Sequence, residues 1–212
     1  MHEIVADPDR GTRFAKIISY LFHPLLLPTV GLLLLFHLDE PGLWLPSTQL
    51  QLFLHAVTLL ATFFLPLLCV LGLLKFGLID SLEMRTKEER KLPYLVSAIF
   101  YFSESYFLMR LDVPVLIQAM MLGATFLIVS TLVVNIFWKI SAHMVGIGGL
   151  CGMFLAISYR LQINLHLPLI VLLIIAGLIG FSRLKLSAHS SAQVYAGFFL
   201  GTVVQLLFLL TL

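Results

Sequence analysis

The stretch Gly180–Gly201, GFSRLKLSAHSSAQVYAGFFLG, places a polar group between two strongly apolar runs. The run before it reads LPLIVLLIIAGLIG and the run after it reads VVQLLFLL. Such runs are typical of membrane helices, so the polar group lies where the chain turns between two spans. It is either an ordinary solvated loop or one half of a functional site.

The rest of the chain is equally apolar. Of its 212 residues 60% are hydrophobic and 11% are charged, with a mean hydropathy of +1.04. Soluble domains carry about 25% charged residues. The composition therefore predicts an all-α polytopic membrane helical bundle, one domain over residues 1–212 with a polar N-terminal segment at 1–16. Cys69 and Cys151 lie in separate apolar runs without ligand spacing, so no metal site is expected.

A membrane helix needs about 20 apolar residues. This criterion predicts six or seven transmembrane helices, with seven preferred, because one candidate is short and another carries Ser103, Glu104 and Ser105 near its middle. The candidate spans are Ile17–His37, Leu50–Leu74, Pro93–Leu111, Val113–Trp138, Ser141–Tyr159, Leu167–Phe181 and Ala188–Leu212.

Seven spans divide the connecting segments into two sets on opposite membrane faces. The set that contains the N-terminus holds eleven of the Lys and Arg residues, and the other set holds only Arg110 and Arg160. Positive residues favour cytoplasmic loops. We therefore expect a multi-pass protein of the cell inner membrane with the first set in the cytoplasm.

Three polar clusters fall in that cytoplasmic set: Asp80–Tyr94, Lys139–Gly149 and the opening stretch. Two spans separate each cluster from the next, so all three return to one face. Arg90, His143, Arg183 and His189 are thereby expected to converge in one pocket. Arginine suits phosphate because its planar guanidinium can donate two hydrogen bonds at once.

Glycines predict how two of the helices pack. His189, Gln193, Gly197 and Gly201 recur every four residues and so share a helix face. Gly146, Gly149 and Gly152 follow His143 at a spacing of three. Small residues let membrane helices approach closely, which would bring the imidazoles of His143 and His189 together. One imidazole could then attack phosphorus while the other protonates the leaving oxygen, without a metal or other cofactor.

These residues resemble the motifs of the type 2 phosphatidic acid phosphatase (PAP2) superfamily of membrane phosphatases. The third family motif is Ser-Arg, five residues, His, three residues, Asp, and the chain has Ser182-Arg183, LKLSA, His189, SSA and Gln193. The second is Pro-Ser-Gly-His, against Ile140-Ser141-Ala142-His143. The first is Lys, six residues, Arg-Pro, for which the chain offers Arg85, Arg90 and Pro93 at another spacing.

The resemblance covers residues 80–212 and implies a PAP2-like core. It implies a hydrolase that acts on a membrane lipid or polyprenyl (pyro)phosphate through a phosphohistidine. His189 would be the nucleophile and His143 the general acid; the phosphate would be bound by Arg183, Arg90, Arg85, Ser141 and Lys139. The implied partners are this substrate and the bilayer, with no nucleic acid, and the oligomeric state is left open.

Gln193 stands where the family has the aspartate that orients the nucleophilic histidine. An amide accepts a hydrogen bond from the imidazole but does not stabilise an imidazolium, and the comparable change in serine proteases costs about 10⁴ in rate. A second hypothesis is therefore a catalytically silent protein that binds phospholipid or serves as a subunit of a membrane complex. A transporter is a weaker third.

Two further polar residues fall inside predicted spans. His23, in FHPLLLP, marks either a helix kink or the wall of a pocket. Glu104 is costly to bury as an anion, so it is either functional or a protonated packing residue.

The predicted orientation can be tested at Ser187. Ser187→Cys should react with a membrane-impermeant thiol reagent only when the cytoplasmic face is opened, because the positive-inside rule places its loop there. Labelling of intact cells and of inverted vesicles measures this. Labelling confined to intact cells would reverse the assignment.

Overall fold

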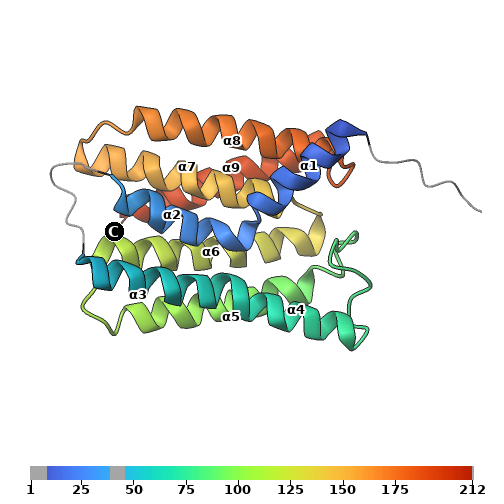
Figure 1. The fold of residues 1–212 in the computed structure, drawn as a ribbon, viewed down its shortest axis with the longest axis horizontal. Coiled ribbons are helices and arrows are strands. Elements are labelled where there is room, and N and C mark those ends of the chain that lie inside the picture. The colour runs from blue at the N-terminus through green and yellow to red at the C-terminus, as the bar shows by residue number, and fades with distance from the viewer. Residues whose placement is uncertain (1–8, 39–45, 212) are drawn as a thin grey trace, which may run out of the picture.

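The structure is a computed structural model and describes residues 9–38 and 46–211, all of whose regular elements are helical. The helices run lengthwise through one bundle, with α1 tilted at one end (Figure 1). Their bounds are α1 (Arg10–Leu21), the 3₁₀ turn η1 (Pro24–Leu26), α2 (Leu27–Phe36), α3 (Thr48–Leu59), the π turn η2 (Leu60–Phe64), α4 (Leu65–Lys75), α5 (Lys91–Leu108), α6 (Val115–Phe137), α7 (Ala142–Leu161), α8 (His166–Lys185) and α9 (Ser191–Thr211).

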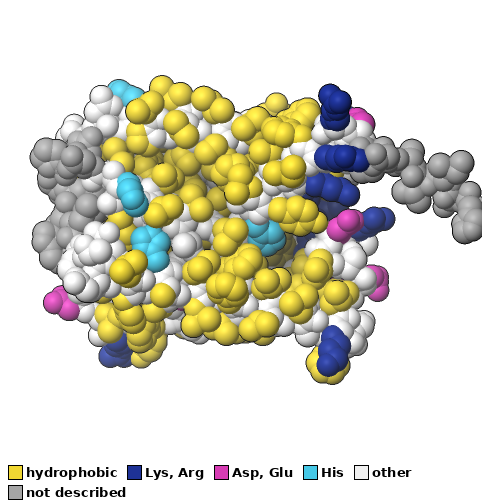
Figure 2. Space-filling model, in the orientation of Figure 1, with side chains coloured by type: hydrophobic (Ala, Val, Ile, Leu, Met, Phe, Trp, Pro, Cys, Tyr) yellow, Lys and Arg dark blue, Asp and Glu magenta, His cyan; other side chains and the backbone are white. Residues whose placement is uncertain are grey.

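Six helical segments of the described chain are long and apolar enough to cross a membrane. They are Arg10–Phe36, Thr48–Lys75 and the four helices α6 to α9. The prediction of a multi-pass helical bundle is confirmed at this level. The predicted span Pro93–Leu111 is not among these six and corresponds to α5. This helix packs against α6 and includes Lys91 and the buried Glu104. Large apolar side chains cover much of the outer surface, as a lipid-facing bundle requires (Figure 2).

Prolines interrupt the first two segments. α1 begins at Arg10, within the predicted polar segment, whose residues 1–8 lie outside the described residues. It ends at Leu21 because Pro24 has no N–H to continue the helical hydrogen bonds and excludes helical geometry at His23. His23 is extended, with φ −62° and ψ 134°. In the second segment the π turn η2 runs into α4, which has Pro66 in its first turn.

Glycines set the contact of α7 with α9, the most extensive helix pair in the bundle. A Cβ at Gly201 would meet the Val145 carbonyl, and one at Gly148 would meet the Phe198 carbonyl. Gly152 and Gly197 are similarly enclosed by backbone of the facing helix. The predicted close packing is confirmed, but of the three predicted glycines of α7 only Gly152 presents its side-chain position to α9. Gly146 faces Leu27 of α2 and Gly149 faces Leu127 of α6, because a spacing of three residues drifts around the helix.

The connections that carry the three polar clusters lie at one end of the bundle, with the start of α1 (Figure 1). They join α4 to α5, α6 to α7 and α8 to α9. Most Lys and Arg side chains visible in Figure 2 gather at this end. We call it the cationic end.

The backbone contact of α7 and α9 predicts that the same alanine substitution at two glycines has different effects on stability. Gly201→Ala should destabilise the protein by about 1–3 kcal/mol, because the added methyl group meets backbone that cannot rotate away. Gly177→Ala is the matched control, since nothing lies within 4 Å of the position that its methyl group would take. Thermal unfolding in detergent measures both. Equal midpoints for the two variants would contradict this packing.

Candidate functional site

A cavity of about 1110 Å³ runs from the cationic end into the bundle. Its polar wall includes three histidines and several cations, whereas its depth is lined by apolar and methionine side chains. The polar lining includes Lys16, Ser19, His23, Glu83, Arg85, Arg90, Lys139, His143, Arg183, Lys185 and His189. The apolar lining includes Phe63, Leu67, Val70, Met120, Met121, Leu127 and Met153. The cavity is thus amphipathic, with its charge at one end.

Arg90 lies at the centre of the polar wall. Its side chain is buried just before α5, and it donates from Nε to the Met84 carbonyl at 2.9 Å. Its Nη1 donates to the Ile140 carbonyl at 3.1 Å and lies 3.4 Å from Nε2 of His189. Arg90 therefore joins the beginnings of α5 and α7 to the loop before α9.

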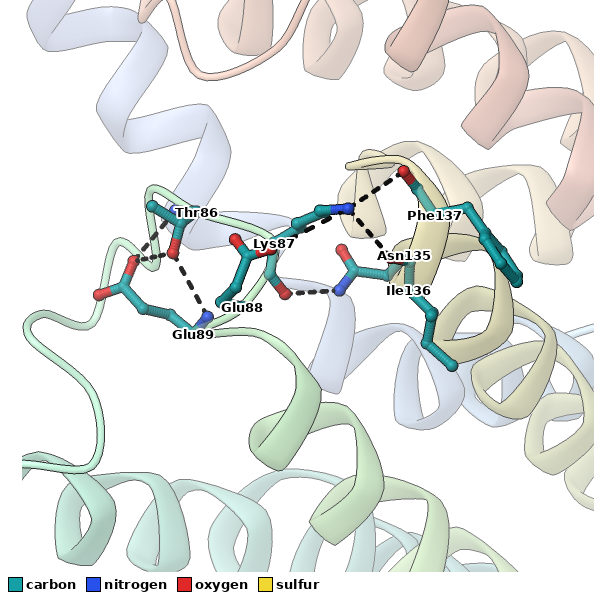
Figure 3. Close-up of polar contacts among 7 residues, drawn as sticks. All are labelled: Thr86, Lys87, Glu88, Glu89, Asn135, Ile136 and Phe137. Atoms are coloured by element: carbon teal, nitrogen blue, oxygen red, sulfur yellow. Dashed lines mark hydrogen bonds and ion pairs between the residues drawn. The ribbon is translucent and has the colours of Figure 1, made fainter.

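The loop that carries Arg90 is fixed to the end of α6 (Figure 3). Lys87 donates to the carbonyls of Ile136 and Phe137, the last residues of that helix, at 3.1 and 3.3 Å. The buried Asn135 returns a hydrogen bond to the Lys87 carbonyl at 2.8 Å. A cation at a helix C-terminus satisfies free carbonyls and the helix dipole. Lys87 thus anchors the loop on which Arg90 is presented.

Gln193 orients His189 through a capping box at the start of α9. Ser190 precedes the helix, and its N–H donates to Gln193 Oε1 at 3.2 Å while its hydroxyl accepts from the Gln193 N–H at 3.4 Å. Because the Ser190 backbone N–H can only donate, the atom of the Gln193 amide that it contacts must be the oxygen. His189 Nδ1 lies 3.0 Å from the same oxygen and must therefore carry the proton. The lone pair of neutral His189 is then on Nε2, facing Arg90.

Arg183 is the second guanidinium of the polar wall. It belongs to the last turn of α8, and its Nη1 donates to the Ser19 hydroxyl at 3.4 Å. Its Nε is buried without a hydrogen-bond partner among the described residues. Within the same part of the chain, neither Arg183 nor Arg90 forms an ion pair with a carboxylate. Two partly desolvated cations thus share a cavity wall without a directly paired carboxylate; Glu83, which also lines the cavity, pairs with Arg85 instead.

His143 and His23 form an imidazole pair beside these arginines. His143 lies in the first turn of α7, and its Nε2 donates to the Ser19 carbonyl at 3.0 Å. Its ring centroid is 5.7 Å from that of His23, in an edge-to-face arrangement. His143 and His189 line the same cavity, as the sequence predicts, but the ring against His143 is that of His23.

Two predicted phosphate ligands lie apart from this group. Arg85 is exposed and pairs with Glu83 at 3.0 Å at the mouth of the cavity. Ser141 is fully buried before α7, and its hydroxyl has no partner among the described residues and does not line the cavity. Lys139 does line it. Sequence reasoning missed Ser19, which no pattern marks, whereas His23 was marked by its flanking prolines.

Within the described part of the chain, no acid takes the place of the aspartate in the motif that the sequence resembles. Glu89 accepts from the Thr86 hydroxyl and N–H, each at 3.0 Å, and Glu104 accepts from Thr58 at 2.6 Å. Among the described residues, the hydrogen-bond partner of His189 Nδ1 is the Gln193 amide. The same residues contain no group of three His, Cys, Asp or Glu side chains that could hold a metal ion.

The electrostatics of the cationic end keep His189 neutral. Burial and the positive charge of Arg90 lower its pKa to about 3, and the Gln193 hydrogen bond only partly opposes them. Burial and the charges of Arg90 and Arg183 also lower the pKa of Lys139. Each cation here disfavours a further positive charge, so the end is suited to an anion.

Searches of protein-family models, curated proteins and solved structures find no match to the chain.

His189 should make stability depend on pH. Between pH 6.5 and about 3 the unfolded chain binds a proton at His189 that the folded protein excludes, so the free energy of unfolding rises with pH. The wild type should therefore lose about 1–2 kcal/mol more than His189→Gln on going from pH 7.5 to pH 5. Unfolding in detergent without phosphate measures the difference. Parallel pH profiles would contradict a neutral buried His189.

Proposed function

We propose that the chain is a PAP2-like membrane phosphatase, a hydrolase that removes phosphate from a lipid or polyprenyl (pyro)phosphate through a phosphohistidine at His189. The observation that carries the proposal is the placement of Arg90 and Arg183 on one cavity wall with His189 and, among the described residues, no paired carboxylate. Removing an ion from water costs several kcal/mol unless an opposite charge compensates it. An anionic ligand would supply that charge.

Phosphate is the anion that this wall fits best. Arg90 and Arg183 offer planar donor groups that match its oxygens. The Nε2 lone pair of His189 faces Arg90, so a phosphoryl group held by that guanidinium would lie next to the nucleophile. The Arg90–His189 contact would then be replaced by contacts of both side chains to the ligand.

The reaction would have two steps. His189 Nε2 forms a bond to phosphorus while the bond to the leaving oxygen breaks, and an imidazolium gives that oxygen a proton. Water then attacks phosphorus, its proton returns to the imidazole, and the phosphorus–nitrogen bond breaks. Arg90 and Arg183 would hold the non-bridging oxygens throughout.

The depth of the cavity supports an amphiphilic substrate. Its volume of about 1110 Å³ exceeds the range of about 300–1,000 Å³ typical of small-molecule pockets. The wall changes from cations and imidazoles to Leu67, Val70 and methionines with depth. A headgroup phosphate at the cationic end would leave its hydrocarbon chain in the apolar part, with the site at the cytoplasmic side of the inner membrane.

A second candidate function is lipid-phosphate binding without turnover. Gln193 favours it, because the amide fixes the ring of His189 but adds no negative charge. Such a protein would bind a phospholipid headgroup for a membrane complex and would keep the cavity intact.

Hydrolysis assays separate the two functions. Purified protein in detergent should release phosphate from a phosphatidate or a polyprenyl phosphate. His189→Ala should lower that rate by at least about 10³-fold, because no other described side chain presents an imidazole to Arg90. His166→Ala, at the opposite end of the bundle, should leave the rate unchanged.

Gln193→Glu provides the decisive comparison. The variant keeps the length of the side chain and the capping box, and it places a carboxylate against His189 Nδ1. An active wild type whose rate is abolished by His189→Ala supports the phosphatase. A wild type that is stabilised against heat by the lipid phosphate but hydrolyses none, even after Gln193→Glu, overturns it in favour of the binding function.

A further inference from the structure

We infer that His23, contributed by the helix break between α1 and η1, is the group that protonates the leaving oxygen. The inference rests on the proposed hydrolysis and deepens it. It assigns a role to a residue outside the part of the chain that resembles the PAP2 motifs. It also differs from the role that the resemblance implies for His143.

The position of His23 is the first argument. Its ring lies between that of His143 at 5.7 Å and that of Phe63 at 6.3 Å, both in edge-to-face contact. His143 belongs to the polar wall of the cavity and Phe63 to its apolar wall. His23 therefore marks the boundary between them. In an amphiphilic phosphate, the atom at that boundary is the oxygen that joins the phosphoryl group to the hydrocarbon.

The hydrogen bonds of His23 are the second argument. In the neutral ring, Nδ1 accepts the Leu25 N–H at the start of the following 3₁₀ turn, at the long distance of 3.4 Å. The ring proton of neutral His23 is therefore on Nε2. This nitrogen has no hydrogen-bond partner among the described residues and is absent from their buried unsatisfied atoms. It is free to donate to a molecule in the cavity.

His143 is held differently. Its Nε2 donates to the carbonyl of Ser19 in α1. The hydroxyl of the same serine accepts from Arg183. The hydrogen bonds of Ser19 thus fix the kinked segment against His143 of α7 and Arg183 of α8. We assign His143 to positioning, through its ring contact with His23 and its bond to α1.

The proton balance closes on His23. The acid form of His23 carries a proton on both ring nitrogens and gives up the long hydrogen bond from the Leu25 N–H. As the phosphorus–oxygen bond breaks, this imidazolium gives its Nε2 proton to the leaving oxygen, and the neutral ring keeps its proton on Nδ1. In the second step the neutral ring takes a proton from the attacking water while the phosphorus–nitrogen bond of His189 breaks. The bound phosphate dianion supplies the negative charge that favours a protonated His23 at the start.

The test compares two leaving groups on one scaffold. The substrates are a dodecyl-substituted benzyl phosphate and a dodecyl-substituted nitrophenyl phosphate, which share a tail and differ in their need for a proton. A benzyl alkoxide must be protonated as it leaves, whereas a nitrophenolate leaves as a stable anion. His23→Asn is the variant, because asparagine keeps an acceptor for the Leu25 N–H.

His23→Asn should slow hydrolysis of the benzyl ester by about 10²-fold or more and that of the nitrophenyl ester by less than about 5-fold. His143→Asn should slow both esters by similar factors. His37→Asn, whose ring bonds to its own helix at the opposite end, should change neither. His23→Ser, which also retains a capping oxygen, should reproduce the selective loss if the asparagine variant fails to fold.

Each other outcome is distinct. Equal losses on both esters with His23→Asn or His23→Ser, or no loss, would overturn the role of His23 and leave the phosphatase standing. A selective loss with His143→Asn instead would show that His143 protonates the leaving oxygen. A wild type that hydrolyses neither ester would overturn the proposed function and this inference with it.

Discussion

The backbone contact between α7 and α9 is the constraint on which the site depends. The glycines of the two helices remove the side chains that would separate them, so Gly197 and Gly201 lie against the carbonyls of Ser141 and Val145. The beginnings of α7 and α9 are therefore held at backbone distance. This is the separation at which one guanidinium, that of Arg90, reaches both the Ile140 carbonyl and His189.

The uncompensated cations follow from that geometry. Arg90 is satisfied by two carbonyl groups and an imidazole, which meet its donors without neutralising its charge. Arg183 donates to one hydroxyl, that of Ser19, and keeps a buried N–H without a partner among the described residues. Structural arginines in membrane bundles generally pair with acids or backbone. Arg90 fits that description through its two carbonyl partners. Arg183, whose buried Nε has no partner among the described residues, is better explained by a ligand than by packing.

The sequence predicts this arrangement in part. Hydrophobic runs locate the spans. Because an even number of spans separates the polar clusters, the sequence also places Arg90, His143, Arg183 and His189 at one end. Both inferences depend only on local composition and order. The contact of His23 with His143 could not be predicted in this way, because it depends on how the break at Pro24 places α1 against α8. Ser19 acts partly through its carbonyl, which every residue carries, so no sequence pattern marks it. Arg85 shows the reverse: it belongs to the predicted basic cluster, yet its side chain is exposed and pairs with Glu83.

Gln193 has two roles: it caps the start of α9 and it orients the ring of His189. As the third helical residue after Ser190 it completes a capping box, for which glutamine is a preferred residue. The same oxygen fixes the tautomer of His189. What it lacks is the charge that would stabilise an imidazolium beside two arginines. In the proposed reaction, nucleophilic attack would start from the neutral ring, and the phosphoryl group that becomes attached to Nε2 would carry its own negative charge. The charge missing from Gln193 would therefore be supplied by the substrate, at the step where His189 becomes positive.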